Sequence, residues 1–353
     1  MTTAPTWLQG SDQPLSAAYD IALLDLDGVC YKGKAPVEFA AEGIAAARAN
    51  GMRAMFVTNN ANRPPHTVAE QLTSLDIPAQ DAEILTAAQA GAAILADDLP
   101  AGSVVLAVGG PGLTEALHEH GFVVTETADD HPVAVIQGFN PEVNWARMSE
   151  AALAIRAGAR FVATNLDATL PLERGQHLGN GALVAAVVHA TGVTPVSGGK
   201  PQAEIFHRAV AKAGGGTALA VGDRLDTDLA GARAADVPGL HVLTGVSDAR
   251  DVVLAIPAER PTFLATDLRG MNTAHPPVEV TLNGRATATC RGAVATCDGQ
   301  RLTLNGTALA GVLVEGLSAD DWRALAAAAW ASADAGRPID AAAVPPLRVL
   351  PEE

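Results

Sequence analysis

The sequence predicts an α/β fold built on parallel strands, with a second α/β segment inserted into it and a smaller α+β segment at its end. Short apolar runs alternate with Ala-rich helical stretches from residue 21 to about residue 268, a pattern typical of buried parallel strands joined by helices. Polar or glycine-containing loops follow several of these runs, at the position where open α/β sheets bind ligands. After about residue 270 the pattern changes to short alternating strands with Asn-Gly and Asp-Gly turns, which predicts β-hairpins.

Continuous apolar runs mark the expected strands, and Ala-rich amphipathic segments between them mark the expected helices. The strands are expected at 21–27, 53–59, 103–109, 132–138, 160–165, 217–223, 239–245 and 261–267. The helices are expected at 36–50, 66–75, 87–97, 112–120, 144–157, 179–190, 201–213 and 226–235. Residues 276–307 predict hairpins. Residues 318–335 predict a helix, because Ser318 is a good N-cap residue and acids occupy the first turn.

Composition limits the classes of function. The 353 residues are long enough for two or three domains, and 48% hydrophobic residues can form packed cores. A net charge of −16 argues against a nucleic acid or an anionic membrane as partner. The sequence has no apolar run long enough to cross a membrane and no signal-peptide pattern in its first sixteen residues, and its three cysteines are too few for a disulfide framework. We therefore expect a cytoplasmic protein.

Acidic residues stand at the ends of two expected strands. Asp25 and Asp27 follow a run of apolar residues, so we expect both near a buried strand end, where a cation would compensate their charge. Asp223 is the last residue of the strand expected at 217–223, and Asp226 and Asp228 come shortly after it. Carboxylates in such a group suit Mg²⁺. Each motif alone is also compatible with a solvated strand end or a helix start. That simpler interpretation explains Asp226 and Asp228 better than Asp223.

Uncharged hydrogen-bonding side chains end a second expected strand, and a lysine lies in a glycine-rich segment further along the chain. Thr58, Asn59 and Asn60 can bind phosphate oxygens without adding charge, although such a triplet alone is more often a turn. Lys200 is one of four lysines beside nineteen arginines and lies in Ser-Gly-Gly-Lys-Pro. Pro201 stands where a P-loop requires Ser or Thr, and an exposed loop lysine is the ordinary interpretation. Because the chain has so few lysines, a functional role for Lys200 is favoured.

Taken in order, these motifs resemble the Asp-x-Asp, Thr/Ser, Lys and acidic-loop motifs of the haloacid dehalogenase (HAD) superfamily. The segments LLDLDGVCYKGKAPV, VTNNANRPP, SGGKP and VGDRLDTDLAGA are similar to the type IIA branch, which contains the N-acetylglucosamine-operon (NagD), nitrophenyl- and phosphoglycolate phosphatases. The resemblance covers about residues 18–270. It implies a Rossmann-like parallel-sheet core at 18–82 and 198–270 and a C2-type α/β cap at 83–197. Residues 271–353 are left as a small C-terminal α+β module.

The resemblance also implies a phosphomonoesterase that uses Mg²⁺, with Mn²⁺ or Co²⁺ as candidate substitutes. In that family pattern Asp25 is the nucleophile that forms an aspartyl-phosphate, and Asp27 is the general acid and then the general base. Mg²⁺ is expected on Asp25, Asp27 and Asp223, with Asp228 behind them as an orienting partner. The phosphoryl oxygens are expected on Thr58, Asn59, Asn60 and Lys200.

The expected cap supplies the substrate preference. Residues 163–171 are similar to the family element Thr-Asn-x-Asp-x-x-x-Pro, which implies that Asn165 and Asp167 contact the substrate. Their side chains suit hydroxyl groups and favour a polyol phosphate. The extension after residue 270 resembles that of actinobacterial, mycobacterial-type glycerol 3-phosphate phosphatases, which implies glycerol 3-phosphate and a place in glycerophospholipid recycling. Phosphoglycolate, nucleotides, sugar phosphates and pyridoxal phosphate are the alternatives. A substrate with a carboxylate would need a cationic cap residue, and the candidates are Arg147, Arg156, Arg160 and Arg174.

Four further interpretations stay open. The run VGGPGL at 108–113 is similar to a dinucleotide-binding turn, but Glu115 stands in place of its third glycine, so we expect a strand-to-helix turn. His177 is expected on the surface. The C-terminal module is expected to be an inert docking segment, with an acetyltransferase or a partner-binding regulatory module as alternatives. The cap is a candidate surface for homodimerisation.

Overall fold

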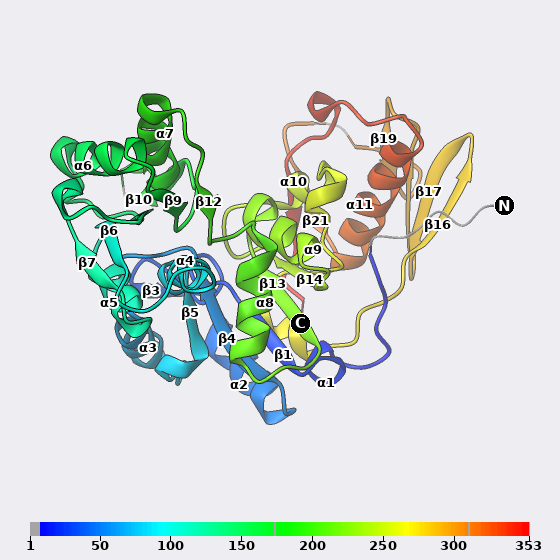
Figure 1. The fold of residues 1–353 in the computed structure, drawn as a ribbon. Helices are drawn as coiled ribbons and strands as arrows, with labels where there is room; N and C mark the ends of the chain where they lie inside the picture. The colour runs from blue at the N-terminus through cyan, green and yellow to red at the C-terminus, as the bar shows by residue number, and fades with distance from the viewer. Residues whose placement is uncertain (1–7, 173, 310, 353) are drawn as a thin grey trace. The chain divides into compact units, whose positions relative to one another are not determined.

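The computed structural model of the chain describes residues 8–172, 174–309 and 311–352. Residues 1–7, which belong to the segment searched for a signal peptide, lie outside the described part. The chain forms two compact units, one of Met1–Ala54 with Gly214–Glu353 and the other of Met55–Ala213. Figure 1 shows the fold with its elements labelled.

The largest sheet of the described residues is a six-stranded parallel sheet with the order β15-β14-β13-β1-β4-β5. In the first unit its strands are almost wholly buried and apolar, as continuous hydrophobic runs predict for parallel strands covered on both faces. Elements of this unit up to residue 272 are α1 (Leu15–Ala18), β1 (Ile21–Leu24), β2 (Tyr31–Lys32), β3 (Ala35–Pro36), α2 (Ala40–Ala49), β13 (Ala218–Gly222), η3 (Leu225–Leu229), α9 (Ala230–Ala234), β14 (Gly239–Val242), α10 (Ala249–Val253), η4 (Pro257–Glu259), β15 (Phe263–Ala265) and η5 (Leu268–Asn272).

The C-terminal segment is an antiparallel sheet covered by one long helix, which confirms the expected α+β segment. Its elements are β16 (Glu279–Asn283), β17 (Arg285–Cys290), β18 (Ala293–Cys297), β19 (Leu302–Leu304), β20 (Thr307–Ala308), β21 (Val314–Leu317), α11 (Ala319–Asp334), η6 (Ala341–Ala343) and β22 (Leu347–Val349). The Ser318 hydroxyl accepts a hydrogen bond from the Asp321 backbone N–H at 3.1 Å and starts α11.

The core of this segment continues into the parallel-sheet part of the same unit. Trp322 and Trp330 of α11 belong to one buried cluster with Val252 of α10 and Leu264 of β15. α11 packs against β17 and β18, and Figure 1 shows it beside β17. The small side chains of its alanines permit this close approach. The C-terminal segment is therefore bound to the rest of its unit through a shared hydrophobic core.

The second unit contains a second parallel sheet, with the order β12-β9-β8-β6-β7. α4 and α5 cover one face of this sheet, and α6 and α7 cover the other (Figure 1). Alternate residues of the strands pack into the two clusters formed with these helices. The unit's elements are β4 (Arg53–Thr58, which begins at the boundary), α3 (Pro65–Ser74), η1 (Asp81–Glu83), β5 (Ile84–Thr86), α4 (Ala87–Ala96), β6 (Val104–Val108), α5 (Pro111–Glu119), β7 (Val123–Thr125), η2 (Ala128–Asp130), β8 (Ala134–Gln137), α6 (Trp145–Arg156), β9 (Arg160–Ala163), β10 (Thr169–Leu172), β11 (Gly175–Leu178), α7 (Asn180–Thr191), β12 (Val196–Ser197) and α8 (Ala203–Lys212).

The expected strands are found with shorter ends, and the expected helices are found with ends that differ by up to four residues. The helix expected at 226–235 is formed by η3 and α9 together. β1 ends at Leu24, before the two aspartates that the sequence assigned to its end. The VGGPGL run is a strand-to-helix turn between β6 and α5. Its glycines allow a close approach, because a Cβ at Gly110 would lie 1.7 Å from the Asn62 side-chain oxygen. Within the described ranges, none of the helices has the length and apolar character that crossing a membrane requires.

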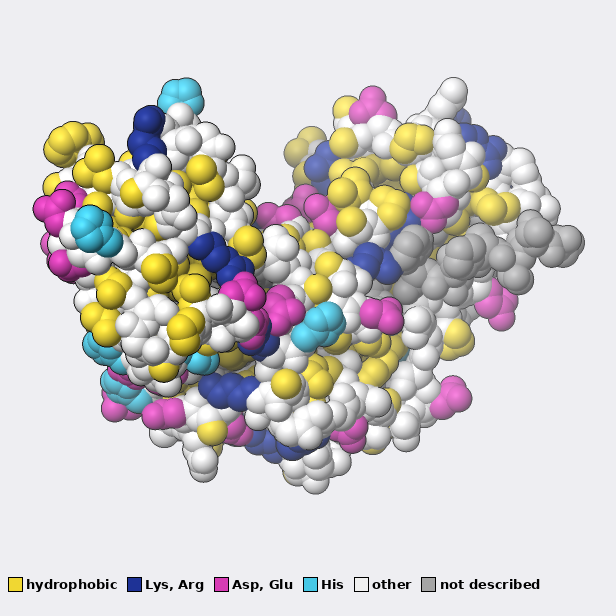
Figure 2. Space-filling view, viewed as in Figure 1, with side chains coloured by type: hydrophobic (Ala, Val, Ile, Leu, Met, Phe, Trp, Pro, Cys, Tyr) yellow, Lys and Arg dark blue, Asp and Glu magenta, His cyan; other side chains and the backbone are white. Residues whose placement is uncertain are grey.

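Basic side chains do not form a broad patch on the face drawn in Figure 2. Among the described residues visible there, Lys and Arg stand singly or in small groups between acidic and neutral side chains. On this face the distribution of the described side chains agrees with the net charge of −16, and no extended basic surface suited to a polyanion is seen there.

Candidate active site

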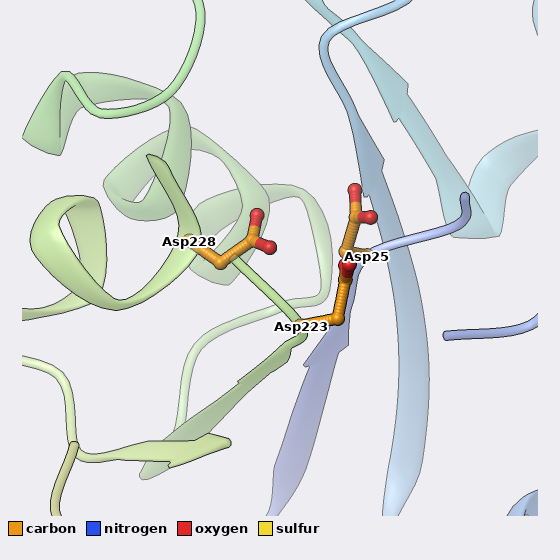
Figure 3. A group of neighbouring side chains, drawn as sticks. All are labelled: Asp25, Asp223 and Asp228. Carbon is orange, nitrogen blue, oxygen red and sulfur yellow. The ribbon is translucent and has the colours of Figure 1, made fainter. Parts of the chain in front are cut away.

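Three aspartates of the first unit form a carboxylate cluster, shown in Figure 3. Asp25, Asp223 and Asp228 each place one carboxylate oxygen within 4.8 Å of those of the other two. Asp25 follows β1 and Asp223 follows β13, its parallel neighbour, so both leave the sheet at the same edge. Asp228 comes from the π-helical segment η3 and points toward them from the side.

Backbone N–H groups hold two of these carboxylates in place. Asp223 is fully buried, and its Oδ2 accepts a hydrogen bond from Val246 N at 2.7 Å. Asp228 is 3% exposed, and its Oδ2 accepts from Arg224 N at 3.1 Å. Carboxylates gathered this closely repel one another, and burial raises the penalty. A hard divalent cation that prefers carboxylate oxygens would offset both effects. The donor set therefore fits Mg²⁺.

Three glycines form the wall behind the cluster. A Cβ at Gly245 would lie 1.8 Å from Asp223 Oδ2, and one at Gly28 would lie 2.5 Å from the same oxygen. A Cβ at Gly222 would lie 2.2 Å from Asp228 Cβ. The carboxylates can occupy these positions only because the facing backbone carries no side chain.

One placement differs from the sequence-based expectation. Asp27 is exposed rather than buried, because the chain leaves the sheet after Leu24 and turns at Gly28 with φ of +94°. Asp228, for which the resemblance implies an orienting role behind the metal ligands, has a carboxylate oxygen within 4.8 Å of those of Asp25 and Asp223. The direction of the Asp228 side chain is set by the π-helical turn of η3. A sequence that predicts an ordinary α-helix after the strand does not predict this direction.

Asn59 and Lys200 are joined in the second unit. Asn59 Oδ1 accepts from Lys200 N at 2.7 Å, and Asn59 Nδ2 donates to the Lys200 carbonyl at 3.0 Å. Lys200 is 4% exposed, and its Nζ donates to the Val57 carbonyl at 3.1 Å. The close approach requires Gly199, where a Cβ would lie 2.6 Å from Asn59 Oδ1. The Asn59 amide thus fixes the backbone that carries a buried lysine.

Thr58 and Asn60 shape the same turn. Thr58 is buried at the end of β4, and its Oγ1 accepts from Asn60 N at 3.1 Å. Asn60 is exposed, and its Oδ1 accepts from Asn62 N at 2.9 Å and from Arg63 N at 3.1 Å. The carbonyl of the Asn60 side chain is therefore part of the turn.

The loop after β9 lies against this turn and brings Asn165 and Asp167 to it. Asn165 Nδ2 donates to the Asn59 carbonyl at 2.8 Å. Both oxygens of Asp167 lie within hydrogen-bond distance of Asn59 Nδ2, at 3.1 and 3.2 Å. Asn180, at the start of α7, supports the loop by donating to the Asn165 carbonyl at 2.8 Å. The second unit therefore brings together Asn59, Lys200, Asn165 and Asp167.

Comparison with known proteins gives the chain its family. Residues 22–123 match the family model of haloacid dehalogenase-like hydrolases, and residues 197–271 match a HAD-hydrolase-like model. The D-glycerol 3-phosphate phosphatase of Mycobacterium tuberculosis is 43% identical over 258 residues, which cover 73% of this chain and 72% of that one. The chain belongs to the haloacid dehalogenase-like hydrolases.

Solved structures place this HAD protein in the branch of NagD- and nitrophenylphosphatase-like phosphomonoesterases. A glycerol phosphate phosphatase from Mycobacterium tuberculosis matches with a TM-score of 0.80 at 36% identity, over 96% of this chain and 95% of that one. Magnesium and calcium complexes of that protein are known. A p-nitrophenyl phosphatase from Archaeoglobus fulgidus matches with a TM-score of 0.67 at 30% identity, over 72% of this chain and 98% of that one.

Most of the arginines that could bind a carboxylate group of a substrate already form hydrogen bonds or ion pairs within the protein. Arg147 donates to the Ala107 carbonyl at 2.9 Å and pairs with Glu126 at 2.9 Å. Arg156 donates to the Ala190 carbonyl, and Arg160 pairs with Asp98. Arg174 and His177 are exposed beside or within the β10–β11 hairpin.

Two features near the carboxylate cluster had no signal in the motifs. Val246 and Ser247, in the loop after β14, hold Asp223 through its side chain and its carbonyl. His241 of β14 is fully buried opposite Gly222, and burial lowers its pKa to about 4. The polar loop after the strand expected at 239–245 was the only sequence signal for this region.

Proposed function

We propose that this HAD phosphatase hydrolyses glycerol 3-phosphate to glycerol and inorganic phosphate, with Mg²⁺ as cofactor. The observation that carries the proposal is the 43% identity to the D-glycerol 3-phosphate phosphatase of Mycobacterium tuberculosis. The match to a glycerol phosphate phosphatase over 96% of this chain supports it, because that range includes the C-terminal segment. The nitrophenylphosphatase structure covers only 72% of this chain.

The carboxylate cluster is the proposed metal site. Asp25, Asp223 and Asp228 would hold Mg²⁺ through carboxylate oxygens, and Asp27 would contribute its backbone carbonyl. The bound cation supplies charge neutralisation of the phosphoryl oxygens. Mn²⁺ and Co²⁺ are candidate substitutes, since they accept the same oxygen donors.

Asp25 and Asp27 would divide the chemistry between them. An Asp25 oxygen attacks phosphorus while the bond to the leaving alkoxide breaks, and Asp27 gives its proton to that alkoxide. The ionised Asp27 then takes a proton from a water molecule as the water oxygen attacks phosphorus. The aspartyl-phosphate bond breaks, which returns the Asp25 carboxylate and releases phosphate. The exposure of Asp27 suits a group that exchanges protons with substrate and water.

The groups of the second unit would bind the transferring phosphoryl group. The Thr58 hydroxyl and the Lys200 ammonium group supply a neutral and a charged donor. Asn59 would act mainly by holding Lys200, because its amide already bonds both backbone groups of that residue. Asn60 would shape the turn.

Two features of the proposed cap favour a substrate whose leaving group carries hydroxyl groups and no carboxylate. They are the polar residues of one loop and the arginines that already have partners. Asn165 and Asp167 lie beside Asn59 and suit hydroxyl groups. Three of the four candidate arginines, Arg147, Arg156 and Arg160, have partners within the cap, which disfavours phosphoglycolate binding at these three positions. The cap is also the proposed dimer surface, where Trp145 of α6 is 83% exposed. Size-exclusion chromatography of Trp145→Ser would test dimerisation.

Phosphate release from glycerol 3-phosphate tests the proposal. Wild type should release phosphate with Mg²⁺ and not with EDTA. Asp25→Asn should lower kcat by at least about 10³-fold while the melting temperature changes little, because the nucleophilic oxygen is lost without a change in volume. Asp226→Asn is the matched control: Asp226 is exposed and pairs with Arg224, so its activity should stay within about twofold of wild type. Substantial turnover by Asp25→Asn would remove Asp25 as the nucleophile.

A further inference from the structure

The C-terminal helix holds the short helix α10 by two buried hydrogen bonds. Trp322 Nε1 of α11 donates to the Ala249 carbonyl at 3.0 Å, and Trp330 Nε1 donates to the Val252 carbonyl at 2.9 Å. Both indoles are almost completely buried. A helix of five residues is too short to be stable alone, so its position depends on contacts of this kind.

The first residue of α10 directly follows the loop that holds the metal-site carboxylate. Val246 N donates to Asp223 Oδ2 at 2.7 Å, and Ser247 N donates to the Asp223 carbonyl at 3.1 Å. Ser247 Oγ accepts from Leu225 N at 3.2 Å, at the start of the segment that carries Asp228. A displacement of α10 would therefore move a partner of the Asp223 carboxylate and would reach the first residue of the segment that carries Asp228.

Trp322 also contacts the strand beneath the cluster. The centroids of the Trp322 and His241 rings lie 6.1 Å apart in an edge-to-face arrangement. His241 is opposite Gly222 in the sheet. Trp322 is therefore connected to the proposed metal site through the Ala249 carbonyl and through His241. Trp330 is bonded to Val252, about one helical turn further from the loop.

We propose that Trp322 is a positioning residue for the metal site, which makes the C-terminal segment a functional part of the catalytic unit rather than an inert docking module. The indole N–H fixes the Ala249 carbonyl and, through the 246–248 backbone, fixes the orientation of the Asp223 carboxylate. Arg250 gives the same helix a second anchor, since it donates to the Val344 carbonyl at 2.7 Å and to the Ala341 carbonyl at 2.6 Å. The proposal rests on the proposed Mg²⁺ site.

Calorimetric titration of the full chain with Mg²⁺ tests it in the absence of substrate. Trp322→Phe keeps most of the ring volume and removes the indole N–H, and Trp330→Phe is the matched control. Partners that directly orient metal ligands typically change metal affinity by about 10–100-fold. One step further away, Trp322→Phe should weaken Mg²⁺ binding by about three- to tenfold and raise the half-saturating Mg²⁺ concentration for activity equally. At saturating Mg²⁺ its kcat should stay within about twofold of wild type.

The outcomes separate the two proposals. Trp330→Phe should lose a similar amount of stability, because the same kind of buried bond is removed, but keep Mg²⁺ affinity within about twofold. Arg250→Gln is the second variant, and it should also weaken Mg²⁺ binding. Equal affinities in wild type, Trp322→Phe and Arg250→Gln would overturn the positioning role, and so would equal weakening by the two Trp variants. A wild-type chain that binds no Mg²⁺ would overturn the proposed metal site itself.

Discussion

Gly245 provides a sharp test of the carboxylate cluster, because its missing side chain is what lets Asp223 occupy its position. In Gly245→Ala the new Cβ would lie 1.8 Å from Asp223 Oδ2, whereas real Cβ contacts essentially never fall below 3.0 Å. The carboxylate or the loop must therefore move by at least about 1.2 Å. Val246 N, next to Gly245, also holds Asp223 Oδ2, so a shift of either the loop or the carboxylate changes the position of that oxygen. Mg²⁺ requires ligand oxygens at about 2.0–2.1 Å in a strict octahedron, so a displacement of this size takes the oxygen out of coordinating distance.

The expected loss of Mg²⁺ affinity is about 10–100-fold, equivalent to about 1.4–2.8 kcal/mol. Overpacking of this kind costs roughly 1–3 kcal/mol of folding free energy, so the variant should still fold. Calorimetric titration gives the affinity, and melting with and without Mg²⁺ gives the linked stabilisation. In wild type Mg²⁺ should raise the melting temperature, and in Gly245→Ala most of that rise should be absent at the same Mg²⁺ concentration.

Gly292→Ala is the matched control, because a Cβ there would meet open space and no left-handed backbone conformation is required. It should bind Mg²⁺ as wild type does. The reasoning is refuted if Gly245→Ala folds and keeps wild-type Mg²⁺ affinity, since Asp223 could not then be a metal ligand in the position described.

The remaining predictions concern stability. Truncation after Gly270 should give an insoluble or unfolded product, because it removes the buried Trp322 and Trp330, and losing one such ring costs about 3–5 kcal/mol; a soluble product that melts within a few degrees of the full chain would contradict the shared core. Burial lowers the pKa of His275 from 6.5 to about 4, so its contribution to stability is complete above pH 6.5 and declines as the pH falls toward 4. Between pH 7 and 5 this loss should be about 2 kcal/mol. The free energy of unfolding of His275→Gln, measured with denaturant, should lack that part of the pH dependence. If the free energies of wild type and variant change with pH in parallel, the predicted contribution of His275 is excluded.

The sequence was sufficient to predict the parallel strands, because strands buried on both faces are continuous apolar runs. Their ends were less accurate: β1 stops at Leu24, where the chain turns toward Gly28. β5 (Ile84–Thr86) and β12 (Val196–Ser197) are too short for a periodic signal. Such strands are defined by pairing with distant neighbours rather than by local composition.

Asp25 and Asp223 could be predicted to lie together, because both follow parallel strands at one edge of a sheet. Asp228 was expected near them only through the family resemblance, and the direction of its side chain depends on the π-helical turn of η3. The link from Trp322 to Ala249 also left no motif, because the acceptor is a backbone carbonyl 73 residues away. Contacts of a side chain with distant backbone leave no spacing in the sequence.

The most direct test of the central claim is phosphate release from a panel of phosphomonoesters, each measured with Mg²⁺ and with EDTA. The panel consists of glycerol 3-phosphate, phosphoglycolate, a nucleoside monophosphate, a sugar phosphate and pyridoxal phosphate. Release that requires the metal and has its highest kcat/KM for glycerol 3-phosphate is the predicted result. A higher kcat/KM for phosphoglycolate would contradict the proposed substrate, and release from none of the compounds would contradict the assignment of this chain as an active phosphatase.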